Sequence, residues 1–105
     1  LKSYQMKNSY LEKKIEILLN SFNSKLFDNV ILKTKPLLKK FPEYIILYNL
    51  LGSSYQNIGK YNEAKDIFLL GLKFDHKNIA LKNNLAMSYK NLLQYSEAEK
   101  LYNEI

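Results

Sequence analysis

The stretch YNLLGSSY at residues 48–55, followed by AKDIF at residues 64–68, decides the fold of this chain of 105 residues. When the sequence is moved along itself until residue 45 meets residue 79, residues 45–71 align with residues 79–105, and ten of these 27 pairs are identical. We call this offset one period. A weaker copy precedes the two, in which Ile17 aligns with both Leu51 and Leu85. Periods between about 30 and 50 residues are typical of proteins that stack one repeated structural unit.

Each copy has the pattern of two amphipathic helices joined by a tight turn. In the middle copy, apolar residues recur at helical spacing over residues 47–58 and again, after a turn at Gly59 and Lys60, over residues 61–72. One such hairpin cannot bury its apolar side alone, so the copies must stack. We therefore predict an all-α fold, an α-α superhelix (solenoid) of antiparallel helix hairpins. We expect helices near residues 8–23, 27–40, 44–57, 61–73, 78–91 and 95–105.

Two features predict how the second helix of each copy begins and where one of these helices is disturbed. Asp28, Asn62 and Ser96 follow one another at one period, and each is suited to cap its helix or to enter the first turn. Pro36 lies inside the second helix of the first copy, where it removes a backbone donor and clashes one turn back. We expect a kink or a break there.

The period and its residues resemble the tetratricopeptide repeat (TPR), whose pattern is W-x2-L-G-x2-Y, then A-x3-F, then P. The middle copy keeps Leu51, Gly52, Tyr55, Ala64 and Phe68 of that pattern. The resemblance implies a TPR solenoid of about three repeats, as a fragment of a longer, bacterial-type protein. Its expected parts are an N-terminal extension of the first helix at residues 1–10, a degenerate repeat at 11–44, a repeat at 45–78 and a truncated repeat at 79–105.

The composition excludes most kinds of catalytic site. The chain has no Cys, which rules out disulfides, thiolate zinc sites and a Cys nucleophile. Its single His, His76, cannot form a metal site alone, and no motif places a Ser and an acid with it in a triad. Carboxylate pairs such as Glu12 and Glu16 have the spacing of solvated helix faces. We expect a protein that is not an enzyme and that uses no cofactor and no metal.

The charge of the chain comes from lysine alone. Sixteen basic residues, all Lys, and ten acidic residues give a net charge of +6. Because Arg is the residue that reads base edges with a bidentate fork, its absence argues against specific nucleic-acid binding. The dense segment Lys33–Lys40 is either a solvated helix face or a contact surface for an acidic partner. Neither a membrane-spanning run nor a signal peptide is visible, so we expect a cytoplasmic protein without membrane insertion, unless a signal precedes Leu1.

The resemblance also implies where a ligand binds. In TPR solenoids the first helices of successive repeats line a concave groove, and that groove holds peptides or protein segments. The matching positions are apolar at the N-terminal end and rich in amides beyond it: Glu12, Ile15, Leu19, Asn23, Asn49, Ser53, Gln56, Asn57, Asn83, Met87, Lys90 and Asn91, with Phe22, Ile46 and Ala80 beside them. Asn23, Asn57 and Asn91 are separated by one period each. They either form a row of amides for an extended peptide or satisfy backbone groups at their own helix ends.

Two functions follow from this interpretation. The first is a non-catalytic protein–protein interaction scaffold that binds a peptide or protein segment in the concave groove. The alternative is a TPR arm of a larger enzyme, such as a sulfotransferase or glycosyltransferase, because residues 18–52 resemble bacterial TPR tracts that precede such domains.

Two further expectations concern the partners. TPR domains that hold the C-terminal carboxylate of heat-shock proteins use a clamp of Lys, Asn and Arg. At the matching positions this chain has Ile15, Leu19, Ala80 and Asn84, so the resemblance argues against that ligand. The apolar residues near Leu92 and Ile105 should be covered by further repeats, by a C-terminal domain or by a partner subunit.

Overall fold

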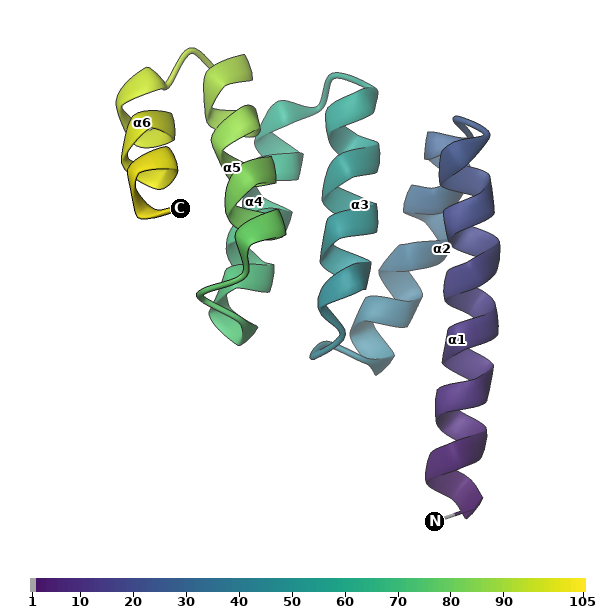
Figure 1. Ribbon diagram of the computed structural model, residues 1–105. Helices are drawn as coiled ribbons and strands as arrows, with labels where there is room; N and C mark the ends of the chain where they lie inside the picture. The colour runs from purple at the N-terminus through teal and green to yellow at the C-terminus, as the bar shows by residue number, and fades with distance from the viewer. Residues whose placement is uncertain (1) are drawn as a thin grey trace.

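The computed structural model describes the backbone of residues 2–105 and the side chains of residues 9–105. This part of the chain is entirely helical and turn-connected, with six helices: α1 (Lys2–Asn23), α2 (Phe27–Lys40), α3 (Ile45–Asn57), α4 (Tyr61–Phe74), α5 (Ile79–Asn91) and α6 (Tyr95–Glu104). Figure 1 shows three antiparallel hairpins side by side, with α1, α3 and α5 in front and α2 and α4 behind them. The predicted all-α solenoid is therefore confirmed. The predicted helix boundaries hold within one residue, except that α1 begins earlier, at Lys2.

The same turn closes all three hairpins. Lys25, Gly59 and Leu93 occupy equivalent positions of the three repeats and have φ angles of +62°, +83° and +62°. In each turn the next amide donates to the carbonyl five residues before it, as in Lys60 N to Tyr55 O at 2.9 Å. This Schellman arrangement ends the first helix of the repeat and reverses the chain. Only glycine adopts a left-handed backbone without a steric cost, so the turns at Lys25 and Leu93 are strained.

The second helices begin without side-chain caps. Asp28, Asn62 and Ser96 lie in the first turns of α2, α4 and α6, and none of them occupies the cap position. At the start of α5, by contrast, the side chain of Asn78 accepts a hydrogen bond from Leu81 N at 2.9 Å. The Asn78 cap thus fixes where the third repeat starts.

The helix α2 passes through Pro36 without a break. The expectation of a break is therefore wrong. Pro36 and Leu32, whose carbonyl would have accepted the missing hydrogen bond, both have exposed side chains. The interruption thus falls on the solvent-facing side of α2, where losing one backbone hydrogen bond costs least.

The core consists of two clusters that meet at α3. The first joins the first hairpin to α3 and comprises Leu11, Leu18, Val30, Leu37, Phe41, Leu47 and Leu50. The second joins α3, α4 and α5 and comprises Tyr48, Leu51, Tyr55, Ala64, Phe68, Leu81 and Leu85. Seven of the 13 residues of α3 are buried. The central helix is therefore the element on which both ends of the solenoid pack.

The spacing between α3 and α4 is set by one glycine. A Cβ atom at Gly52 would lie 2.3 Å from the ring of Phe68, which is fully buried. Any larger residue at this position must displace the ring or separate the helices. The corresponding pairs in the other repeats are Leu18 with Thr34 and Ala86 with Tyr102.

Candidate functional site

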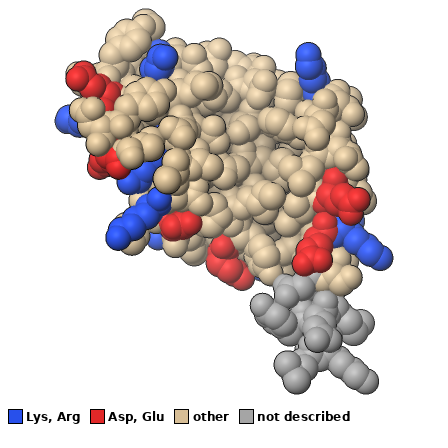
Figure 2. All heavy atoms as spheres, in the orientation of Figure 1, with Lys and Arg blue, Asp and Glu red and all other residues tan. Residues whose placement is uncertain are grey.

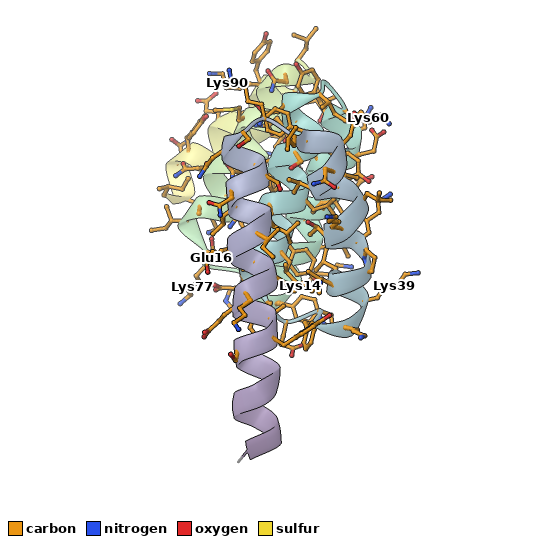
Figure 3. All side chains as sticks on the ribbon, turned by 90° about the vertical axis from the view of Figure 1, so that its right-hand side faces the viewer. Lys14, Glu16, Lys39, Lys60, Lys77 and Lys90 are labelled. Carbon is orange, nitrogen blue, oxygen red and sulfur yellow. The ribbon has the colours of Figure 1, made fainter. Side chains whose placement is uncertain are left out.

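The face formed by α1, α3 and α5 is uncharged at its centre. Residues 44–59, which include all of α3, contain no charged side chain. Figure 2 shows this face with charged side chains around the rim and an uncharged, hollowed centre. Figure 3, viewed from the α1 end, places Lys77 and Lys90 on one side of the molecule and Lys39 and Lys60 on the other. The positive charge of the chain is therefore spread over the periphery.

A hollow of about 250 Å³ lies on this face between α1 and α3. Its apolar walls include Leu19 and Ile46, which are each 39% exposed. Three polar side chains, those of Asn23, Asn49 and Ser53, complete the lining. The structure thus brings together the following residues from the predicted groove: Leu19, Phe22, Asn23, Ile46, Asn49 and Ser53. Leu50, which the sequence analysis did not place in the groove, also lines the hollow.

Next to this hollow, hydrogen bonds between side chains join α3 to α5. Asn84 Nδ2 donates to Asn49 Oδ1 at 2.9 Å, and Ser88 Oγ donates to Gln56 Oε1 at 2.6 Å. Two residues predicted to bind a ligand, Asn49 and Gln56, therefore also hold successive first helices together. Each uses its side-chain oxygen in this contact, which leaves the NH₂ group available to a ligand.

The remaining groove candidates lie outside the hollow. Asn57 Nδ2 donates to Ser53 O at 2.7 Å, so the amide in the middle of the expected row bonds to its own helix end. Ile15 is half-buried against the first core cluster. The others are exposed on α1 and α5: Glu12, Asn83, Met87, Lys90 and Asn91.

One buried residue of this face escaped the sequence analysis. Ser54 stands one period before Ser88 and is fully buried, but its hydroxyl has no hydrogen-bond partner in the described part of the chain. The residue of α1 that corresponds to Gln56 is Phe22, which cannot accept a hydrogen bond. A comparison of residues 22 and 56 in the aligned repeats would have revealed this unpaired hydroxyl.

The chemistry of this face favours binding an uncharged ligand. Burial raises the pKa of the Tyr48 and Tyr89 phenols, and the carboxylates of Glu43 and Glu97 add to the effect, so both phenols stay protonated at neutral pH. In the described residues, no group of three or more His, Asp and Glu side chains is placed to hold a metal ion. Nor does that part of the chain include a helix of the length and apolarity needed to cross a membrane.

Comparison with known proteins gives a family match and several structural neighbours. The family model described as "Tetratricopeptide repeat" matches residues 45–78. No curated protein sequence is significantly similar to the chain.

The structural neighbours share the fold at low sequence identity. PcrH in complex with the chaperone-binding region of PopD is 18% identical, with a TM-score of 0.87 over 92% of this chain and 73% of that one. The second TPR of Spaghetti (RPAP3), bound to the HSP90 peptide SRMEEVD, is 15% identical, with a TM-score of 0.86 over 99% and 95% of the two chains. MamA AMB-1 is 20% identical, with a TM-score of 0.78, and the match covers 83% of this chain and 51% of MamA. The present chain thus spans about half the length of the MamA chain.

Proposed function

We propose that this chain, which belongs to the tetratricopeptide-repeat family, is a non-catalytic protein-interaction scaffold whose α1–α3–α5 face binds a peptide or a protein segment. The observation that carries this proposal is the uncharged apolar hollow of about 250 Å³ between α1 and α3, beside the hydrogen-bonded amides of α3 and α5. An apolar recess flanked by a few polar groups is the usual composition of a binding site.

The structural neighbours support a protein ligand. The PcrH structure contains a region of PopD, and the Spaghetti (RPAP3) structure contains a peptide of HSP90. Two proteins that share this fold over most of the present chain therefore hold a segment of another protein. We infer that the present chain uses its fold in the same general way.

The lining of the hollow indicates what kind of segment binds. Leu19 and Ile46 offer apolar contact to one side chain of the ligand, and the Asn49 NH₂ group is positioned to donate to a backbone carbonyl. An acidic peptide such as SRMEEVD gains no attraction from this face, because residues 44–59 carry no charge. We therefore propose an extended, largely uncharged segment with one apolar anchor residue.

Selection of peptides from a displayed random library, followed by fluorescence anisotropy, tests this function. The variant Ile46→Asp places a charge in the hollow and should weaken selected peptides by at least about tenfold, since burying an unpaired carboxylate is costly. Leu70→Asp is the matched control, because Leu70 is similarly exposed but lies on α4, away from the hollow. Peptides that bind both variants and the parent chain equally would contradict the proposal, and so would a library that yields no binder.

A further inference from the structure

A second hollow, of about 450 Å³, lies among α4, α5 and α6, and none of the groove candidates lines it. We refer to it as the α4–α6 pocket. Its apolar lining includes Leu72, Leu85 and Leu101. Leu85 is almost fully buried and belongs to the second core cluster, so the pocket reaches the core of the third repeat. His76 and Lys82 are part of its lining.

In the preceding repeat, a tyrosine of the chain itself fills the corresponding space. Tyr48 stands one period before Lys82 and is only 5% exposed. Its hydroxyl donates a hydrogen bond to the backbone carbonyl of Pro42, and its ring lies 5.9 Å from the ring of Phe74 between centroids. The absence of a side chain at Gly71 makes room for Tyr48, because a Cβ there would lie 2.9 Å from the Tyr48 Cβ.

The third repeat lacks this tyrosine. Lys82 takes its place, and its ammonium group reaches Glu104 Oε2 at 3.7 Å instead of entering the space with a ring. An unbranched lysine side chain has no bulky ring to cover an apolar wall, and its charged head stays near solvent. The replacement of Tyr48 by Lys82 therefore accounts for a pocket in the third repeat where the second repeat is filled.

The hydrogen-bond acceptor used by Tyr48 has a counterpart in the third repeat. The loop before α3 is closed by Tyr44 N donating to Phe41 O at 3.2 Å, and the loop before α5 is closed by Asn78 N donating to Asp75 O at 3.1 Å. Since the two loops have the same turn, His76 occupies the position of Pro42. The pocket thus combines an apolar lining with a backbone carbonyl at one end.

We propose that the α4–α6 pocket binds a tyrosine side chain presented by a partner protein. The ring packs on Leu72, Leu85 and Leu101, and the hydroxyl donates to the backbone carbonyl of His76. The chain itself supplies the argument for this occupant, because a tyrosine fills the same space one repeat earlier. A buried aromatic ring with one hydrogen bond is a common anchor of protein interfaces. This inference does not depend on the function proposed for the α1–α3–α5 face.

Titration of the ¹⁵N-labelled chain with N-acetyl-tyrosinamide tests the pocket directly. We expect saturable chemical-shift changes, with a Kd on the order of millimolar, centred on the amides of residues 72, 76–78, 85 and 101. N-acetyl-phenylalaninamide, which lacks the hydroxyl, should bind roughly 3- to 10-fold more weakly because it loses one hydrogen bond. Equal binding of the two probes, or changes centred on the hollow between α1 and α3, would overturn the proposal.

The variant Lys82→Tyr gives an independent readout. It restores the tyrosine of the second repeat, so we expect it to raise the melting temperature and to abolish the response to N-acetyl-tyrosinamide. Lys39→Tyr is the matched control, because Lys39 is exposed on α2 and does not line the pocket. An undiminished response in Lys82→Tyr contradicts the proposal. If this variant does not fold, the comparison of the two probes on the parent chain still decides the question.

Discussion

The junction of α1 with α3 is apolar, whereas the junction of α3 with α5 is joined by hydrogen bonds. In the second of these junctions, Ser88 donates to Gln56 at 2.6 Å. In the first, the same two positions hold Ser54 and Phe22, and the Ser54 hydroxyl is buried without a partner in the described part of the chain. The same stacking geometry thus accommodates two different chemistries.

A second pair of positions shows the same contrast. Asn84 donates to Asn49 at 2.9 Å across the α3–α5 junction, and the corresponding residues of the α1–α3 junction are Leu50 and Ile15. Both of these belong to or pack on the first core cluster. The face therefore changes from apolar to amide-rich along the solenoid. This change is what allows one ligand to be anchored at one end and hydrogen-bonded at the other.

The substitution with the largest expected effect, Gly52→Ala, breaks both junctions at once. The added methyl would lie 2.3 Å from the buried Phe68 ring and would displace the helix that the two junctions share. We expect the free energy of unfolding, measured in urea, to fall by about 2–3 kcal/mol. Adding Phe68→Leu should restore part of this loss. An unchanged midpoint for Gly52→Ala would show that α3 and α4 are not packed as described.

The same substitution in the two junctions should have effects of opposite sign. Ser88→Ala removes a hydrogen bond and should lower the free energy of unfolding by about 1 kcal/mol. Ser54→Ala removes a buried hydroxyl that has no partner in the described residues, so it should raise that free energy by about 0.5–1 kcal/mol. Chemical denaturation of both variants alongside the parent chain measures the difference. Equal losses in the two variants would mean that the junctions do not differ in this way.

The hairpin turns allow a smaller effect to be measured. Leu93 is 72% exposed and has a φ of +62°, so Leu93→Gly should stabilise the chain by roughly 0.5–1 kcal/mol, because it relieves strain and removes little packing. Gly59→Ala is the matched reverse change, since a Cβ there has open space around it but the φ is +83°. Thermal unfolding should show a rise for the first variant and a fall for the second. A fall for both would indicate that Leu93 stabilises the fold through contacts.

Alkaline pH should weaken the second core cluster. The pKa of Tyr48 is raised above its unfolded value of 10.0, mainly by burial and also by Glu43. The folded state therefore favours the protonated phenol, so this contribution to stability is complete below pH 10 and is lost as the pH rises through the folded pKa. Tyr48→Phe should make the loss of stability above pH 10 less steep. Equilibrium unfolding at a series of alkaline pH values measures this slope, and identical slopes would contradict the burial of the hydroxyl.

The repeat period made most of the fold predictable from the sequence. Ten identities between residues 45–71 and residues 79–105 located the helices from residue 45 onward, and local apolar spacing located the first hairpin. Partner assignment was less accessible, because Asn49 and Gln56 bond to residues 35 and 32 positions away. Propensity at one position does not specify which surface of the next repeat will face it. The continuous helix at Pro36 also depended on tertiary context, namely which side of α2 is exposed.

A crystal structure of the chain with a library-selected peptide tests the central claim most directly. We expect the peptide to lie along α1, α3 and α5, with one apolar side chain between Leu19 and Ile46 and a backbone carbonyl bound by Asn49. A peptide bound on the side of α2 and α4, with the hollow between α1 and α3 unoccupied, would contradict the proposed role of this face.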